Sequence, residues 1–263
     1  MAELYLIIDT ETANDIDCPL CYDISFAVID KNGRIYTKYS FVVQEIFRHE
    51  RDLMTSCYFA EKLPQYEADI ENGTRLLRSI YDIREILHKV AKNFNARAIM
   101  AHNALFDYRA LNNTIRYITK SKTRYFLPYN LEIWDTLKMA RQIFGTSAEY
   151  KKFCDEHLFL TKHNKPQLTA EVLYRYITND IDFIEAHTGD EDIKIEKVIF
   201  SECLKANPDI EKRLFKTKEE KERIEKEKAE KKKKKKKGID KTERMIYNIY
   251  ENERSVANGK RTD

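Results

Sequence analysis

The pattern of apolar and turn residues over the first 43 positions predicts three strands. Residues 4–8 form a short continuous apolar run, which is consistent with a buried strand. Residues 22–30 and 34–43 are two further apolar runs, and the Asn32-Gly33 pair between them is a hairpin signal. The chain is therefore expected to open on one strand followed by an antiparallel hairpin.

Helical periodicity dominates from residue 75 onward. Apolar residues recur at three-to-four spacing over residues 75–95, which predicts a long helix. Short apolar strands are expected at 98–101 and 131–134. Further helices are expected over 103–118, from 135, and over 147–159, 168–178 and 190–204. Strands that alternate with helices after a hairpin predict an α/β protein with a mixed sheet flanked by helices.

Charge divides the chain into two parts. The sequence is 42% hydrophobic and 35% charged, with a net charge of +3. Residues 211–237 hold 15 Lys or Arg against 7 Asp or Glu, and residues 238–263 are balanced, so residues 1–210 carry −5. We therefore expect a folded domain over 1–210 and a Lys/Glu-rich basic tail over 211–263, partly disordered or helical.

Several classes of protein are disfavoured by composition. No apolar run reaches the roughly 18 residues of a membrane span, and the N-terminus lacks the features of a secretory signal, so we expect a cytoplasmic protein. Five cysteines without such a signal argue against a disulfide framework. Cys18 and Cys21 have the spacing of half a zinc site, but no second pair completes it, and ordinary free thiols are the favoured interpretation.

Acidic residues follow two of the predicted strands. Asp9 and Glu11 close the first strand, where two carboxylates on one face repel each other. A divalent cation would relieve this repulsion, whereas the alternative is a solvated strand end. Asp107 follows the 98–101 strand on the first helical turn, where the helix dipole favours an anion, so it could simply stabilise that terminus.

A third segment combines a histidine with acids. The pKa of histidine is near neutral, so His187 could accept a proton from water, and Asp192 follows it at a loop-to-helix junction. The alternative is a group of helix-capping acids beside a surface histidine. Asp190 competes with Asp192 as a ligand, although the spacing from His187 favours Asp192.

Together these segments resemble, in order and spacing, the three exonuclease motifs of the DEDD superfamily. Histidine in the third motif is typical of the DEDDh (DnaQ-like) branch, which includes the proofreading epsilon subunit of bacterial DNA polymerase III. The resemblance covers about residues 3–204. The matching residues are Asp9 and Glu11, then His102, Asn103, Phe106 and Asp107, then His187 and Asp192.

The resemblance implies a ribonuclease-H-like fold and a 3′–5′ exonuclease that releases nucleoside 5′-monophosphates by a two-metal mechanism. It implies His187 as general base. It implies two Mg²⁺ or Mn²⁺ ions held by Asp9, Glu11, Asp107 and Asp192. The implied substrate contacts are Thr10, Thr12, His102, Asn103 and Phe106, and packing in the core is the favoured alternative for Phe106.

The expected partner is a nucleic acid with a 3′ end. Single-stranded DNA is favoured, RNA or short oligonucleotides remain open, and a catalytically idle nucleic-acid-binding module is a third hypothesis. Any role in replication or repair would require a separate protein partner, which the C-terminal tail could contact. Residues 211–237 could instead tether nucleic acid through salt-sensitive phosphate contacts, or remain a solvated charged tail.

Overall fold

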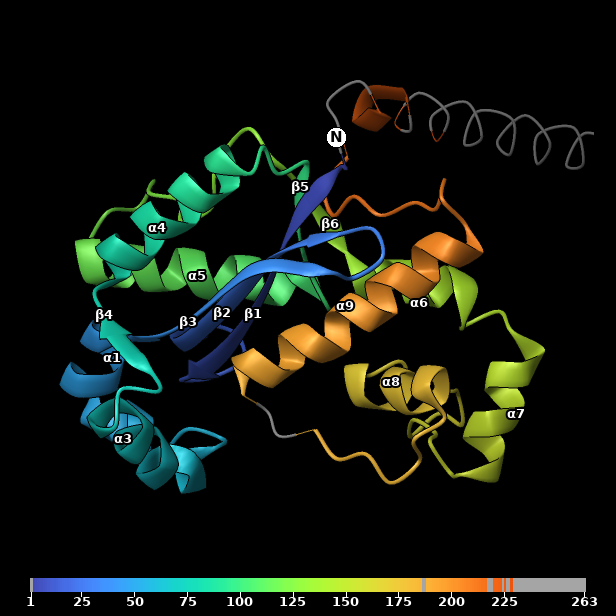
Figure 1. Cartoon of the computed structure of the whole chain (residues 1–263), viewed down its shortest axis with the longest axis horizontal. Helices are drawn as coiled ribbons and strands as arrows, with labels where there is room; N and C mark the ends of the chain where they lie inside the picture. Colours follow the sequence, from blue (N-terminus) through green and yellow to red (C-terminus); the bar gives the residue numbers. More distant parts are fainter. Residues whose placement is uncertain (1, 186–187, 217–219, 224, 226–227, 229–263) are drawn as a thin grey trace, which may run out of the picture. The chain divides into compact units, whose positions relative to one another are not determined.

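The computed structural model describes residues 2–185, 188–216, 220–223, 225 and 228 (Figure 1). Contacts divide the chain into two units, Met1–Leu214 and Phe215–Asp263. Every strand and helix named below belongs to the first unit. Most of the predicted basic tail, together with His187, lies outside the described residues.

One six-stranded mixed sheet, in the order β4-β3-β2-β1-β5-β6, forms the centre of the first unit. Its strands are β1 (Leu4–Ala13), β2 (Leu20–Asp30), β3 (Ile35–Val43), β4 (Leu76–Arg78), β5 (Ala98–Ala101) and β6 (Glu132–Asp135). β1, β2 and β3 are antiparallel neighbours, whereas β4, β5 and β6 each join the sheet in parallel. The predicted α/β class with a mixed sheet is confirmed.

Helices cover both faces of this sheet (Figure 1). One core contains α4 (Ile80–Asn93), α5 (Ala104–Thr119) and the helical segment formed by α1 (Gln44–His49), α2 (Arg51–Thr55), η1 (Ala60–Lys62) and α3 (Leu63–Glu71). The other contains α6 (Thr136–Ile143), α7 (Ala148–Glu156), α8 (Ala170–Thr178) and α9 (Gly189–Ala206). Among the described residues, no helix combines the length and apolar character that crossing a bilayer requires.

Side chains of β1 alternate between the two faces of the sheet, so the strand contributes residues to both cores. Leu6 and Ile8 pack with the α4 and α5 side, whereas Tyr5 and Ile7 pack with the α9 side. Successive residues of a strand point to opposite faces, so one strand can be buried on both. The same alternation continues into the polar end of β1 and decides which helix each of its acids faces.

Local signals explain most of the element boundaries. The Asp30 carboxylate accepts the N–H groups of Asn32 and Arg34 at 2.9 and 3.1 Å, and Gly33 adopts a φ of +77°, so the predicted hairpin forms. The Ser79 hydroxyl accepts from the backbone of Asp82 and begins α4.

The predicted helix over residues 75–95 is wrong at its start. Leu76–Arg78 is the edge strand β4, which pairs with Phe41–Val43 of β3, and the helix begins only at Ile80. The sheet edge competes for these backbone groups, and apolar spacing alone does not detect that competition. The helices between residues 44 and 71 were not predicted.

The first unit continues past residue 210 along the outer edge of β6. The Asp135 N–H donates to the carbonyl of Lys212 at 2.8 Å, and the Leu214 N–H donates to the carbonyl of Ile133 at 2.7 Å. A truncation that removes residues 211–214 would therefore leave backbone groups of β6 without partners.

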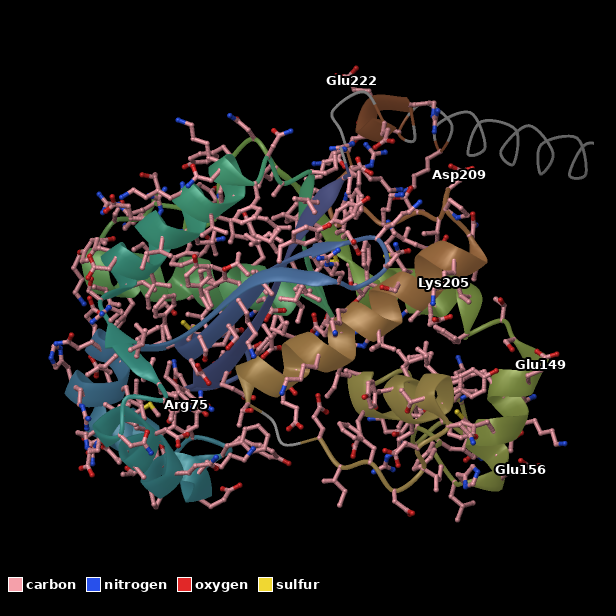
Figure 2. All side chains as sticks on the ribbon, in the orientation of Figure 1. Arg75, Glu149, Glu156, Lys205, Asp209 and Glu222 are labelled. Carbon is pink, nitrogen blue, oxygen red and sulfur yellow. The ribbon has the colours of Figure 1, made fainter. Side chains whose placement is uncertain are left out.

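A buried ion pair fastens the segment between α3 and β4 to the sheet. Arg75, labelled in Figure 2, places Nη1 2.7 Å from Oδ2 of Asp23, and the Tyr66 hydroxyl donates to the same oxygen at 2.6 Å. The guanidinium also pairs with Asp69 at 3.2 Å and lies 4.2 Å from the centre of the Tyr66 ring. Asp23 is the register partner of Glu11, so this cluster borders the acidic end of β1.

We predict that Arg75→Met lowers the free energy of unfolding by roughly 3 kcal/mol, because it leaves Asp23 buried without its counter-charge. Urea denaturation at pH 8 measures the loss. Arg78→Met is the matched control, since Arg78 is exposed and its replacement should change stability by less than about 0.5 kcal/mol. Equal losses in the two variants would show that the buried pair contributes nothing.

Candidate active site

Strand β1 presents two acids to α9. Asp9 and Glu11 share the face on which Tyr5 and Ile7 pack with the helices of the second core. The pairing of β1 with β2 shifts by one residue between Glu11 and Thr12, so the strand is irregular directly after the second acid. Thr12 is half-buried at this irregularity.

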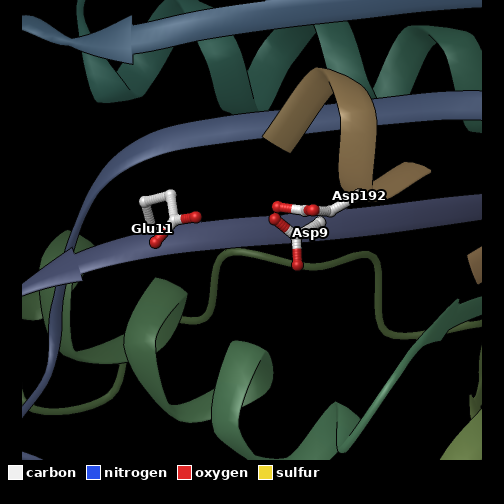
Figure 3. Close-up of side chains that lie close together, drawn as sticks. All are labelled: Asp9, Glu11 and Asp192. Atoms are coloured by element: carbon white, nitrogen blue, oxygen red, sulfur yellow. The ribbon is translucent and has the colours of Figure 1, made fainter. Parts of the chain in front are cut away.

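Helix α9 brings a third acid to the same place. Asp192 lies on the first turn of α9, where its backbone N–H donates to the carbonyl of Thr188 at 3.1 Å. Asp9, Glu11 and Asp192 each offer an oxygen, and these oxygens all lie within 4.8 Å of one another. Figure 3 shows the carboxyl groups of Asp9 and Asp192 side by side, with Glu11 further along β1.

Asp107 approaches from the opposite side of β1. It lies on the first turn of α5, is 4% exposed, and accepts a hydrogen bond from the Thr10 hydroxyl at 2.8 Å. Thr10 points away from Asp9 and Glu11 because neighbouring residues of a strand alternate. The sequence Asp9-Thr10-Glu11 therefore supplies two acids on one face and a positioning hydroxyl on the other.

Burial and mutual repulsion raise the pKa values of these acids. Burial, together with Asp192 and the other neighbouring carboxyls, raises the pKa of Asp9 well above its ordinary value. Burial also raises the pKa of Asp107 to about 7, and burial with the nearby Glu185 raises that of Asp192 to about 9. Without a positive charge, the site would hold protons at neutral pH.

Glu11 shares this behaviour. Burial and the nearby Asp23 carboxyl raise the pKa of Glu11 to about 8, while Lys62 lowers it in part. A cation that took the place of the protons on these carboxyls would stabilise the ionised forms of Glu11 and its acidic neighbours together.

Orphaned oxygen atoms test whether a metal fits. Oδ2 of Asp9, Oδ1 of Asp192 and Oε2 of Glu196 are buried, and none has a hydrogen-bond partner among the described residues. Buried polar atoms are ordinarily satisfied, and unsatisfied carboxylate oxygens on acids that repel one another are open to a cation. Carboxylate oxygens are the ligands that Mg²⁺ and similar hard cations prefer. The donor set therefore fits a divalent cation.

Glu196 is an acid that the sequence analysis missed. It is 2% exposed, its Oε1 accepts the backbone N–H of His102 at 2.9 Å, and burial together with Asp107 raises its pKa well above the ordinary value. The signal was its position four residues after Asp192, since residues four apart lie on the same face of a helix. Glu196 links α9 to the turn that begins α5.

The start of α9 packs unusually close to β2. A Cβ added at Gly189 would lie 2.8 Å from the hydroxyl oxygen of Ser25 and 3.3 Å from its backbone nitrogen. The backbone of Gly189 also forms a hydrogen bond that lowers the pKa of Asp23, against the larger effect of burial, which raises it. Glycine at this position lets the helix that carries Asp192 begin directly against the sheet.

The remaining predicted residues lie in different surroundings. Nε2 of His102 is 2.9 Å from the carbonyl of Leu168 and Nδ1 is 3.1 Å from the Thr136 hydroxyl, so protein atoms contact both ring nitrogens. Asn103 is exposed, whereas Phe106 is half-buried and belongs to neither described core cluster.

Two residues of the predicted third motif have no described side chain. His187 and the side chain of Asp190 lie outside what the structure describes.

All five cysteines are free: Cys18 is exposed and Cys21 is buried, as are the other three. The Cys21 thiol donates to the Asp23 carbonyl, with Sγ 3.2 Å from that oxygen.

Comparison with solved structures identifies the fold. E. coli exonuclease I, in a zinc-bound complex with single-stranded DNA, shares 14% identity at a TM-score of 0.50, over 80% of this chain and 42% of that chain. Cell-death related nuclease 4 shares 13% identity at a TM-score of 0.50, over 78% of this chain and 65% of that one. This chain therefore spans less than two thirds of either protein. The expected ribonuclease-H-like fold is confirmed.

Comparisons of sequence alone give a different outcome. No protein-family model matches the chain, and no curated protein matches it. The likeness is thus one of fold, at identities of 13 and 14%.

The raised pKa values predict how the metal-free protein responds to pH. Carboxyls that keep protons in the folded state up to about pH 7 to 9 bind more protons than the unfolded chain above about pH 4.5. Stability should therefore fall as pH rises from 5.5 to 8, by up to about 1.4 kcal/mol per pH unit for each retained proton. Thermal unfolding after chelator treatment measures this fall.

Divalent cation should reverse that loss, because it binds the ionised carboxyls. We expect Mn²⁺ to raise the Tm of the wild-type protein more at pH 8 than at pH 5.5. In the double variant Asp9→Asn/Asp192→Asn, the rise in Tm with Mn²⁺ should be much smaller. A metal-free protein whose Tm does not fall with pH, or an equal response to Mn²⁺ in both proteins, would contradict the account of the site.

Proposed function

We propose that this chain is a divalent-metal-dependent 3′–5′ exonuclease that hydrolyses the terminal phosphodiester bond of a nucleic acid. The observation that carries the proposal is the convergence of Asp9, Glu11 and Asp192 from two distant parts of the chain. Asp107, from a third part, lies on the opposite side of β1, where the Thr10 hydroxyl donates to it, and its charge acts on Asp9. A fold shared with two nucleases accommodates this chemistry.

These carboxyl groups would together hold two metal ions. The charges of Asp192, Glu196, Asp107 and Glu11 all raise the pKa of Asp9, after the larger effect of burial. We infer that Asp9, Glu11 and Asp192 would hold one divalent ion, and that Asp107 and Asp9 would help to hold a second. Bound Mg²⁺ or Mn²⁺ would supply charge stabilisation and help activate a water molecule.

His187 is proposed as the general base. It would take a proton from the water that attacks the terminal phosphorus, as the bond to the 3′ oxygen breaks. That oxygen then takes up a proton, which leaves a shortened strand with a 3′ hydroxyl and a nucleoside 5′-monophosphate. Thr10 and Thr12 are proposed to contact the terminal nucleotide through their backbone groups, and Asn103 and Phe106 to contact the strand.

DNA is the favoured substrate, and RNA is the second candidate. The exonuclease I structure that shares this fold was solved with single-stranded DNA, which makes unpaired DNA the first substrate to test. Competition between single-stranded DNA and RNA of equal length distinguishes the two. A catalytically idle binding module would instead be stabilised by metal without turning over either polymer.

The basic segment over residues 211–237 is proposed to add affinity for the substrate. Clustered lysines neutralise phosphates without regard to sequence, and this contribution falls steeply with salt. A contact with a replication or repair protein is the alternative for the same tail. Truncations that test this proposal should retain Leu214, whose backbone pairs with β6.

We predict that Asp9→Asn lowers the rate of Mn²⁺-dependent nucleotide release by roughly 1,000-fold, because loss of metal binding removes several kcal/mol of transition-state stabilisation. A 5′-labelled oligonucleotide should give a ladder of products that shorten from the 3′ end. Asp15→Asn, on an exposed turn residue, is the matched control and should retain full activity. Cleavage of circular single-stranded DNA, which has no end, would overturn the exonuclease assignment.

His187→Ala should lower kcat by roughly 100-fold, the effect expected of a lost general base, while the affinity for Mn²⁺ stays unchanged. The rate should also lose its dependence on a group that titrates near neutral pH. His49→Ala serves as the control for the loss of a histidine, since His49 is exposed. A variant that keeps the wild-type rate and pH profile would exclude His187 as the base.

A further inference from the structure

A cleft lined by cationic side chains adjoins the turn that precedes the Asp107 helix. It is a cleft of about 700 Å³ formed where α6 and the start of α8 meet the loop that precedes α8. Arg141, Lys162, His163 and Lys165 all line it, and none of the described residues that line it is acidic. Residues 1–210 as a whole carry a net charge of −5, so this concentration of cationic side chains is local.

The wall of the cleft is largely apolar beneath this charge. Leu137, Pro166 and Leu168 contribute to it. Apolar surface with a few cationic groups suits a ligand that has flat rings and anionic links, which describes a nucleotide. The bases of a duplex are stacked and paired, whereas unpaired bases can enter such a cleft.

The cleft is joined to the acidic site through the turn that begins α5. His102 and Asn103 both line it. The His102 N–H donates to Glu196, and the His102 ring contacts the carbonyl of Leu168, so this one residue connects α9 to the wall of the cleft. Asp107 follows on the first turn of the helix that Asn103 precedes.

We propose that this cleft binds unpaired nucleotides of the same strand whose 3′ end lies at Asp9, Glu11 and Asp192. Lys162 and Lys165, with Arg141, contact its phosphates, and the apolar wall receives its bases. The inference rests on the proposed function, because it takes the substrate to be a nucleic acid. It adds that unpaired nucleotides next to the 3′ end contribute to the binding of the substrate.

Binding to a strand that cannot be cut tests the proposal. The full chain carrying Asp9→Asn is compared with the same chain carrying also Lys162→Ser and Lys165→Ser, by fluorescence anisotropy with a labelled 12-nucleotide single strand. Both lysines are exposed, so the fold should be retained. Lys92→Ser/Lys151→Ser removes the same charge from two other exposed positions and is the matched control.

We expect the cleft variant to raise Kd about tenfold at moderate salt and the control to change it less than about twofold. The decline of the logarithm of the binding constant with the logarithm of salt concentration should become less steep by about 1.4, since each of the two lost phosphate contacts to a single strand contributes about 0.7. Affinity for blunt duplex and for free thymidine monophosphate should not depend on the cleft lysines.

Equal affinities in the cleft and control variants would overturn the proposal, as would an effect confined to the mononucleotide or to duplex. These outcomes are distinguishable from failure of the nuclease assignment, which is read from cleavage by the wild-type chain. A protein that binds single strands through the cleft but never cuts them would refute the proposed nuclease activity and support the proposed binding cleft.

Discussion

Carboxyl groups buried against one another cannot all ionise without a positive charge between them, and this constraint shapes one end of the molecule. Asp9 lies at the centre of that repulsion, with acids of β1, α5 and α9 around it. Several of their oxygens have no hydrogen-bond partner among the described residues. A protein holds such an arrangement at a cost to stability, and a divalent cation turns the same arrangement into a binding site.

The fold delivers the acids to this point through simple geometry. Strand alternation turns Asp9 and Glu11 toward α9 and turns Thr10 toward Asp107 on α5. Close packing at Gly189 lets α9 begin against β2, so that Asp192 meets the strand. Each acid thus comes from a strand or helix that is anchored by other residues buried in one or both cores. Precise placement of ligands follows from this rigidity.

Sequence was informative where one local pattern decides the outcome. The hairpin at Gly33 and the shared face of Asp9 and Glu11 follow from spacing within short windows, and the mixed sheet follows from the order of strands and helices. It failed where distant backbone competes: Leu76–Arg78 joined the sheet edge instead of the helix that its spacing favoured. The spacing from Asp192 places Glu196 on the same helix face, but only the fold shows that it accepts the N–H of His102, 94 residues earlier in the chain.

The central claim is that these carboxyls hold divalent metal together, and anomalous diffraction tests it most directly. A crystal soaked in Mn²⁺ and measured near the manganese absorption edge should show strong peaks within coordinating distance of Asp9 and Asp192, at about 2.2 Å. We expect a second peak that shares Asp9 and lies toward Asp107. Fully occupied manganese positions elsewhere in the molecule, with no anomalous peak between β1 and α9, would contradict the account.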